Sequence, residues 1–433
     1  MKACIYTLGC RVNQYESDAI MQELKKYGAE IVPSSEECDI CIINTCSVTS
    51  ESDRKSKQII RRLTAKNPNA VVIVTGCYSQ INPTDAMGIK GVSLVCGNND
   101  KSQIAGLATK LYRERCAECQ YVESDIYGGK FDVMRVGAPL TRTRAFIKIQ
   151  DGCNSKCAYC IIPYARGSVR SNLPSNILDE ARTVVNEGCP EIVFAGIETA
   201  AYGKDFKNRY SLGDLLTEVH KIDGLKRIRL GSLDPSAITA DFVDKIKALP
   251  KIANHFHISM QSGCTKTLND MRRKYNAEMA KRSISYLRDA FNGLMLSADV
   301  ITGFPGESDE DFAQTLDFFK EQRFLHLHVF PYSKRAGTPA AEMKNQVPEN
   351  IKKERLHKLT DQQKSIKREL LEDFISSNST VEVLFESFDG EFSLGHTTSF
   401  IEIKAKSQDS LGGELLLVRP TYTDGDIVYG EIL

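Results

Sequence analysis

Three cysteines stand close together in the stretch DGCNSKCAYC, as Cys153, Cys157 and Cys160. Thiolates bind metals, and the C-x3-C-x2-C spacing offers three ligands where a closed iron–sulfur site uses four. A four-cysteine cluster suits electron transfer, whereas an iron with an open position can bind a substrate as a Lewis acid does. The spacing therefore predicts a reactive iron–sulfur site.

Three further cysteines occupy equivalent positions in the first part of the chain. Cys10 follows the apolar run KACIYT, Cys46 follows CDICIIN, and Cys77 follows AVVIVT. Each thus lies at the C-terminal end of an expected strand, and parallel strands present those ends along one edge of a sheet, where open α/β folds bind ligands. One such cysteine is more often a small buried hydrophobe. Three in the same position predict a second metal site.

The pattern along the chain predicts the elements that must carry these cysteines. The first part alternates apolar runs with amphipathic segments, which is typical of an α/β domain with a parallel sheet. After a connector without periodicity, six repeats of strand and helix predict a parallel βα array, and four short alternating strands then predict a small β-barrel. The expected division is an N-terminal domain, a linker, a central domain and a C-terminal barrel, at residues 1–114, 115–138, 139–370 and 371–433.

Length and composition limit the classes of protein. A chain of 433 residues exceeds the size at which one core usually stops growing, so two or three domains are expected. No signal-like segment follows Met1 and no long apolar run occurs, which predicts a cytoplasmic protein without a membrane partner. Fourteen cysteines in a reducing compartment predict metal ligation or burial and not a disulfide framework. The linker pair Cys116 and Cys119 is a weak metal signal of unassigned role.

Charge is unevenly distributed although the formal net charge is zero. From Leu371 onward there are twelve Asp or Glu against three Lys or Arg, so the preceding part of the chain is basic. A basic body suits a polyanion such as RNA, and an acidic tail domain would be repelled by it. The alternative for each basic group is an ordinary solvated face. The candidate RNA contacts are Arg54, Lys55, Lys57, Arg61 and Arg62, and separately Arg272, Arg273 and Lys274.

These motifs resemble those of a known family. IKIQDGCNSKCAYCIIPYARGSVRS resembles the signature of radical S-adenosylmethionine enzymes, and TLGCRVNQYES, NTCSVT and VTGCYSQ resemble the three cysteine motifs of the methylthiotransferase N-terminal domain. SMQSG, MRRKYN and VITGFPGE are similar to the core motifs of that family. The resemblance implies an α/β fold in which a radical SAM partial (β/α)6 barrel lies between an N-terminal parallel-sheet domain and a small all-β TRAM barrel. The sequence that flanks the cysteines is most similar to that of the bacterial tRNA branch, which acts on N6-threonylcarbamoyladenosine beside the anticodon.

The resemblance also implies the chemistry. Cys153, Cys157 and Cys160 would hold a [4Fe-4S] cluster that reduces S-adenosylmethionine to give a 5′-deoxyadenosyl radical, which removes hydrogen from adenine C2. A second [4Fe-4S] cluster would carry the sulfur, methylated by a second S-adenosylmethionine, on the ligands Cys10, Cys46 and Cys77. The implied partners are a tRNA anticodon stem-loop, a reduced electron donor such as a flavodoxin or ferredoxin, and a sulfur source.

Further residues follow from the same resemblance as candidates for binding S-adenosylmethionine. They are Tyr159, Arg170, Gln261 and Asp299, and no separate acid or base is assigned. Glu198, after FAGI, has no assigned role.

Two alternatives stay open at this point. The same chemistry could act on ribosomal protein S12, which as a basic protein would suit the acidic C-terminal barrel. A non-catalytic iron–sulfur electron carrier or zinc scaffold would need a fourth ligand in each trio, and Cys96 is the candidate for the trio Cys10, Cys46 and Cys77.

Two His-x-His pairs, at His255 and at His326, each place two imidazoles on one strand face, where interior packing is favoured over a metal site.

Overall fold

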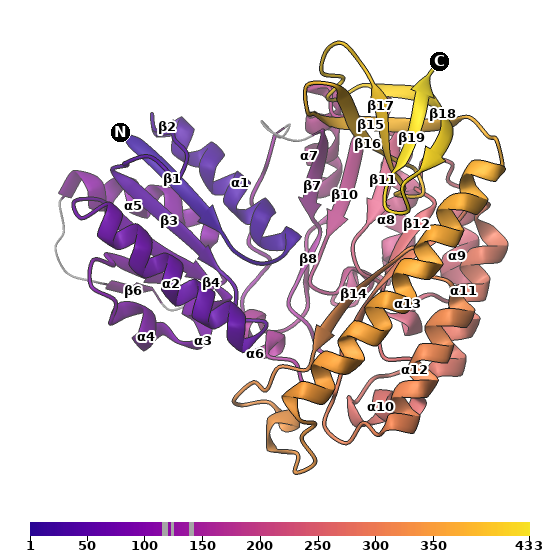
Figure 1. The fold of residues 1–433 in the computed structure, drawn as a ribbon. Helices are drawn as coiled ribbons and strands as arrows, with labels where there is room; N and C mark the ends of the chain where they lie inside the picture. The colour runs from indigo at the N-terminus through magenta and orange to yellow at the C-terminus, as the bar shows by residue number, and fades with distance from the viewer. Residues whose placement is uncertain (115–119, 123–124, 138–142) are drawn as a thin grey trace.

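A computed structural model describes residues 1–114, 120–122, 125–137 and 143–433 of the chain. The predicted linker pair Cys116 and Cys119 lies outside the described residues. Figure 1 shows an N-terminal lobe beside a larger body that carries a small barrel at the C-terminus. Within the described part of the chain, none of the helices combines the length and apolar character needed to cross a bilayer.

The N-terminal lobe is a six-stranded sheet in the order β2-β1-β3-β4-β5-β6, and all of its strand pairs are parallel. Every residue of β3 and β4 is buried, because helices cover both faces of the sheet and continuous apolar runs such as ICIIN can then form its centre. The predicted parallel-sheet α/β domain is confirmed. Its strands are β1 Lys2–Thr7, β2 Glu30–Ile31, β3 Ile40–Thr45, β4 Val71–Gly76, β5 Leu94–Cys96 and β6 Gln120–Val122. Its helices are α1 Arg11–Lys26, α2 Ser50–Lys66, α3 Cys77–Ile81, α4 Pro83–Met87 and α5 Ile104–Glu114, with a 3-10 turn at Lys101–Gln103.

The central body contains six parallel strands in two three-stranded sheets, β7-β10-β11 and β12-β13-β14. Isolated bridges, among them Leu233 to Ile258, connect the two sheets, so the strands form the predicted partial barrel. The strands are β7 Arg144–Lys148, β10 Glu191–Ala195, β11 Arg227–Leu230, β12 His255–Gln261, β13 Met295–Thr302 and β14 His326–Pro331, with the short pair β8 Gln150–Asp151 and β9 Arg170–Ser171. The helices are α6 Ile162–Arg166, α7 Pro174–Asn186, α8 Leu212–Val219, α9 Ala240–Lys247, α10 Thr265–Asp270, α11 Ala277–Ala290 and α12 Asp309–Gln322, with 3-10 turns at Thr199–Ala201, Pro235–Ala237 and Pro339–Glu342.

A closed five-stranded barrel, ordered β15-β16-β17-β19-β18, follows the long helix α13, Glu349–Ser376. Its strands are β15 Val381–Phe388, β16 Phe392–Thr397, β17 Glu402–Lys406, β18 Leu415–Thr423 and β19 Val428–Ile432. The predicted barrel is confirmed, but the prediction of four strands was wrong because it lacked β16. The inward positions of β16 are Ser393, Gly395 and Thr397, so the strand has no apolar alternation to reveal it.

Acidic residues of this barrel pair with arginines at the starts of the central strands. Arg144 of β7 forms an ion pair with Glu386, and Arg227 of β11 lies 3.2 Å from Glu382. Arg229 donates hydrogen bonds to the backbone carbonyls of Thr397 and of the residue after it. Part of the acidity of the C-terminal barrel therefore attaches it to the central body.

A buried carboxyl joins the N-terminal lobe to the central body at α7. The backbone N–H of Val136 donates to Glu180 at 2.8 Å, and the Tyr15 hydroxyl of α1 lies 3.0 Å from the same carboxyl. Tyr15 has one hydroxyl hydrogen and lies 2.6 Å from the Met134 carbonyl oxygen, so its oxygen is free to accept a hydrogen bond from protonated Glu180. Burial raises the pKa of Glu180 to about 8, because no described cation pairs with it.

Glu180→Gln is expected to flatten the pH dependence of stability. In the unfolded chain the carboxyl ionises near its ordinary pKa of about 4.3, whereas in the folded chain it keeps its proton to about pH 8. Its contribution is therefore complete below about pH 4 and is lost as the pH rises through about 8, a loss of a few kcal/mol. Urea unfolding across this range measures it, with the exposed Glu278→Gln as control. Identical pH profiles for wild type and Glu180→Gln would contradict the assignment.

Candidate active site

The first cysteine trio lies along one edge of the N-terminal sheet. Cys10 caps the N-terminus of α1, Cys46 follows β3, and Cys77 begins α3 directly after β4. Because β1, β3 and β4 are adjacent and parallel, the three strand ends bring these residues together as predicted. A Cβ placed on Gly9, whose φ is +107°, would lie 3.2 Å from the Cys46 sulfur, so the tight approach of the chain beside Cys46 requires glycine.

The thiols of this trio act on one another electrostatically. Burial raises the pKa of Cys46 to about 11, and the neighbouring Cys77 and Cys10 raise it further. Cys10 keeps accessible surface, but the protein atoms around it still raise the pKa of its thiol. A metal centre binds thiolates, so binding at this trio would release protons.

The second trio lies in the loop between β8 and α6. Cys153, Cys157 and Cys160 line one cavity of about 530 Å³, and Tyr164 and Arg272 stand at the same cavity. Burial raises the pKa of the Cys160 thiol to about 12. Three sulfur donors around a cavity fit a cluster held by three cysteines, with space beside it for a further ligand.

Hydrogen-bond donors face two sulfurs of this second trio. The Cys157 sulfur accepts a hydrogen bond from Arg273 at 3.1 Å, and the Cys153 sulfur accepts one from the backbone N–H of Ser155 at 3.4 Å. The Arg273 guanidinium also contacts Asp234 at 2.7 Å, and its side chain is only 7% exposed. The prediction that Arg273 contacts RNA was therefore wrong: its charge is held inside the site, where hydrogen bonds to sulfur can adjust the reduction potential of a cluster.

The structure places two of the four predicted cofactor-binding residues as follows. Tyr159 is half-buried beside the second trio, with its hydroxyl 3.4 Å from Arg273. Arg170 is buried, and it donates a hydrogen bond to the Ile126 carbonyl at 2.6 Å, which occupies part of its guanidinium. Their roles toward S-adenosylmethionine stay predictions.

The other two of these residues lie on β12 and β13. Gln261 ends β12 with φ of +62°, a conformation that non-glycine residues rarely adopt and that often marks functional sites. Asp299 of β13 lies 3.2 Å from the ring nitrogen Nε2 of His257. Their roles toward S-adenosylmethionine likewise stay predictions.

Glu198 had no assigned role from sequence. It is half-buried after β10, and its charge acts on Cys153. Burial, aided by Asp234, raises the pKa of Glu198 to about 7. It therefore belongs to the surroundings of the second trio.

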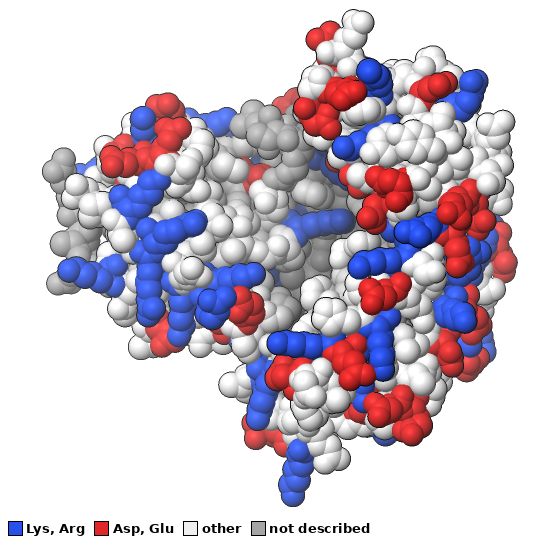
Figure 2. Space-filling view, viewed as in Figure 1, with Lys and Arg blue, Asp and Glu red and all other residues white. Residues whose placement is uncertain are grey.

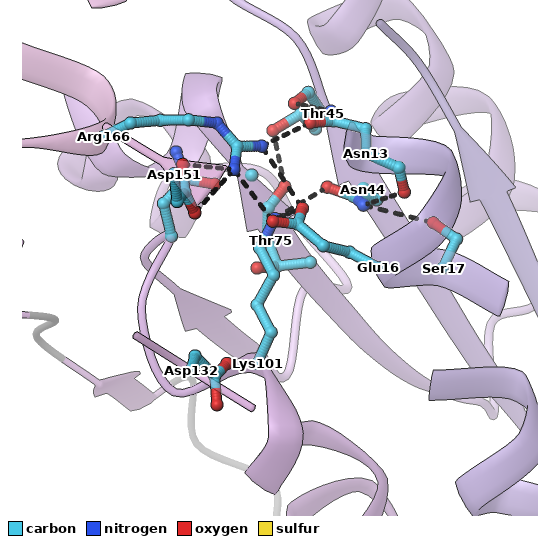
Figure 3. A network of polar contacts seen from close by, with 12 residues as sticks. Asn13, Glu16, Ser17, Asn44, Thr45, Thr75, Lys101, Asp132, Asp151 and Arg166 are labelled. Atoms are coloured by element: carbon cyan, nitrogen blue, oxygen red, sulfur yellow. Dashed lines mark hydrogen bonds and ion pairs between the residues drawn. The ribbon is translucent and has the colours of Figure 1, made fainter. Parts of the chain in front are cut away.

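A network of buried charges joins the segments that carry the two trios. Figure 3 shows its members Glu16, Asp151 and Arg166. Arg166 of α6 donates to Glu16 of α1 at 2.8 Å, to Asp151 of β8 at 3.1 Å and to Asn13 at 2.5 Å. Lys148 of β7 donates to Glu16 at 2.7 Å and lies 2.6 Å from Asp151. Asp151 is two residues before the first cysteine of one trio, and Asn13 is three residues after the first cysteine of the other. The network therefore fixes the two cysteine-bearing segments against each other.

This network carries more positive than negative charge. Lys101 joins it by an ion pair with Glu16, and Arg170 lies 3.8 Å from Asp151, so four cations surround the two carboxylates, Glu16 and Asp151. The excess positive charge favours anionic thiolates nearby. Arg166 acts in this way at Cys10, where it opposes the rise of the thiol pKa that burial causes. Sequence patterns did not single out Arg166, Lys101, Lys148 or Glu16.

The candidate fourth ligand of the first trio lies elsewhere. Cys96 is buried in the apolar cluster formed by α1, α5 and one face of the sheet. This core position does not favour the electron-carrier alternative, which needs Cys96 as a ligand. Another group, Cys4, Cys38 and Cys41, brings three thiols within 4.8 Å of one another, and the structure gives them no contact with either trio in the described residues.

Comparisons with known proteins extend over both halves of this site. Residues 147–319 match the Radical SAM superfamily, and residues 2–97 match Uncharacterized protein family UPF0004. Threonylcarbamoyladenosine tRNA methylthiotransferase MtaB of Bacillus subtilis is 40% identical over 420 residues, which cover 96% of this chain and 92% of that protein. The chain belongs to the radical SAM tRNA methylthiotransferase family. It is thus an enzyme, and the family implies a [4Fe-4S] cluster and S-adenosylmethionine as cofactors.

Other relatives carry two different substrate names. Threonylcarbamoyladenosine tRNA methylthiotransferase MtaB of Aquifex aeolicus is 37% identical, over 86% of this chain and 90% of that protein. The tRNA-2-methylthio-N(6)-dimethylallyladenosine synthase of Alkaliphilus oremlandii is 34% identical, over 100% of this chain and 93% of that protein. Among solved structures, the radical S-adenosylmethionine methyltransferase TsrM from Kitasatospora setae has a TM-score of 0.57 at 13% identity, over 78% of this chain and 74% of that one. TsrM therefore shares the fold.

Arg166→Met is expected to destabilise the protein by about 3–5 kcal/mol, because it removes one of the two buried cations, with Lys148, that contact both carboxylates. Arg182→Met is the matched control, since Arg182 pairs with Asp179 on the surface at 58% exposure and should cost less than about 1 kcal/mol. Urea unfolding of both variants measures the difference. Adding Glu16→Gln to Arg166→Met should cost less than the sum of the two single changes. Equal losses in Arg166→Met and Arg182→Met would contradict the role of the network.

Proposed function

We propose that this enzyme converts N6-threonylcarbamoyladenosine beside the tRNA anticodon to its 2-methylthio derivative, in the cytoplasm. The observation that carries the proposal is the pairing of two three-cysteine sites across one buried charge network. A reaction that activates a carbon and then delivers sulfur to it needs two centres at a fixed separation. The identity to relatives named for this substrate supports the choice of base.

The two trios would each hold one [4Fe-4S] cluster. When bound, these clusters and two molecules of S-adenosylmethionine supply radical chemistry at an unactivated C–H bond, and they supply the sulfur and methyl group. The ligands are the ones predicted from sequence. Cys10, Cys46 and Cys77 of the first trio would hold one cluster, and Cys153, Cys157 and Cys160 of the second trio would hold the other. The domain boundaries of the sequence prediction also stay a prediction.

The residues of the chain position this chemistry. Arg273 holds the Cys157 sulfur through a hydrogen bond, and the network around Arg166 sets the separation of the two cysteine segments. The network side chains are buried, so their ion pairs are little weakened by water.

The RNA would approach over basic surface. Figure 2 shows Lys and Arg gathered on the N-terminal lobe and at the rim of the hollow between the lobe and the main body. On α2, Arg61 and Arg62 are exposed, whereas Arg54 pairs with Glu51 and Lys57 with Asp85 at 2.8 Å. We propose a tRNA anticodon stem-loop, a reduced flavodoxin or ferredoxin and a sulfur source as partners.

Ribosomal protein S12 remains the second candidate substrate. The observation in its favour was the acidic C-terminal barrel, but Glu382 and Glu386 of that barrel pair with arginines of the central body. This internal use of the acidic side chains weakens the argument for a basic protein substrate. Mass spectrometry of tRNA nucleosides from cells lacking the enzyme distinguishes the two: the methylthio mark on threonylcarbamoyladenosine should disappear, and an unchanged profile would favour S12.

Removing one ligand from each trio in turn should distinguish the functions of the two sites. Cys157→Ala and Cys10→Ala are each expected to lose about half of the iron and all methylthiolated product, since each site loses a required thiolate. Cleavage of S-adenosylmethionine should persist in Cys10→Ala and fail in Cys157→Ala. Cys96→Ser is the control and should keep iron and product. Loss of iron in Cys96→Ser would support the electron-carrier alternative.

A further inference from the structure

Five of the seven histidines of the chain line one cavity of about 260 Å³. The cavity lies where the three parts of the molecule meet: Arg11 comes from α1 of the N-terminal lobe, Lys367 from α13, and Phe400 from the C-terminal barrel. The histidines are His255, His257, His326, His328 and His396. His326 and His328 are exposed, so the expectation that interior packing explains the His-x-His pairs was wrong for this pair.

Arg11 connects this cavity with the first cysteine trio. It directly follows Cys10, and its guanidinium lies 5.9 Å from the centre of the Phe146 ring. Among the described residues no carboxylate forms an ion pair with Arg11, whereas the other cation of the cavity, Lys367, lies 3.2 Å from Asp426. Arg11 thus provides a cation without an ion-pair partner among the described residues, beside the proposed sulfur-carrying site, although the carboxylates of Glu191 and Asp299 act on it electrostatically.

The histidines supply further polar groups around this cation. Ser297 lies 2.9 Å from His257 and 3.0 Å from His255, and Asp299 lies 3.2 Å from His257. Partial desolvation by the surrounding protein lowers the pKa of His328 and of His326. Uncharged imidazoles can both donate and accept hydrogen bonds, which suits a ligand with carbonyl, hydroxyl and carboxylate groups.

We propose that this cavity receives the N6 substituent of the target adenosine and that Arg11 binds its carboxylate, with His328 as a further polar contact. The inference rests on the proposed function, because a threonylcarbamoyl group carries a carboxylate, a hydroxyl and a urea. The planar guanidinium matches a carboxylate with two parallel hydrogen bonds. Arg11 and His328 are on this basis specificity-determining residues.

The alternative contents of the cavity fit less well. A dimethylallyl group, as named for the relative from Alkaliphilus oremlandii, is apolar and would give Arg11 no hydrogen-bonding partner, which a site built from hydrogen-bonding groups rejects strongly. Donor atoms of His257, Asp299 and His328 lie within 4.8 Å of one another and could hold a metal ion. However, Arg11 acts electrostatically on both Asp299 and His328, and a second cation there would be repelled.

The test uses three anticodon stem-loop RNAs whose target adenosine is threonylcarbamoylated, dimethylallylated or unmodified. Fluorescence anisotropy with the reconstituted, iron-loaded enzyme measures the affinity for each. Wild type should bind the threonylcarbamoyl RNA roughly 10- to 100-fold more tightly than the unmodified RNA, as expected for charged hydrogen bonds. Arg11→Gln should remove this preference and keep the affinity for unmodified RNA, and Arg11→Lys should restore part of it.

Several controls separate the possible failures. Arg182→Gln removes an exposed ion pair on the surface and should behave as wild type. Measuring the iron content verifies that Arg11→Gln keeps its clusters. If Arg11→Gln loses iron, His328→Gln replaces it and should reduce the preference severalfold. Equal wild-type affinities for the threonylcarbamoyl and unmodified RNAs, with the threonylcarbamoyl RNA still converted to product, would overturn this inference alone. Conversion of only the dimethylallyl RNA would overturn the proposed function as well.

Discussion

The buried ion cluster around Glu16 and Arg166 is the constraint on which the arrangement of the active site depends. Burying six charges costs several kcal/mol for each ion unless partners and hydrogen bonds compensate, and apolar residues would hold the two segments together at less cost. Arg166 contacts Glu16, Asp151 and Asn13 at once, and a fixed set of directional bonds defines a relative position that apolar contact would leave adjustable. The network thus specifies the distance between two reactive centres.

The same network makes the two cysteine trios parts of one site. The strand ends of the N-terminal sheet collect the first trio, and the loop after β8 collects the second, but neither element determines where the other trio lies. Part of that relation comes from α1, β7 and α6, through side chains that are essentially unexposed, and Arg335 adds an ion pair with Asp53 of α2. The positive excess of the network also reduces the cost of placing two sets of thiolates near each other, because like charges in a medium of low dielectric constant repel strongly.

Sequence patterns predicted the elements and the cysteines well because these depend on local periodicity. Apolar runs such as ICIIN gave the strands, and the cysteines follow those runs at fixed positions. The patterns failed where a side chain acts through tertiary contacts: Arg273 looked like a surface cation in MRRKYN but is held by Asp234 and Cys157. Strand β16 was missed because its inward residues are small and polar. Lys148 is the one member of the network that the sequence could have indicated, because it is a charged residue inside an otherwise apolar strand. Its partners could not be predicted without the fold.

The cavity proposed to determine substrate choice, by contrast, lies where all three parts of the molecule meet. The cavity with Arg11, Lys367 and Phe400 exists only when the C-terminal barrel is attached to the central strands, and that attachment uses ion pairs from Arg144 and Arg227 to acidic residues of the barrel. The acidity that first seemed to oppose RNA binding therefore helps to build the cavity that we propose receives the N6 substituent. In such an arrangement the barrel contributes to specificity by closing a cavity, even where its own surface makes no contact with phosphate.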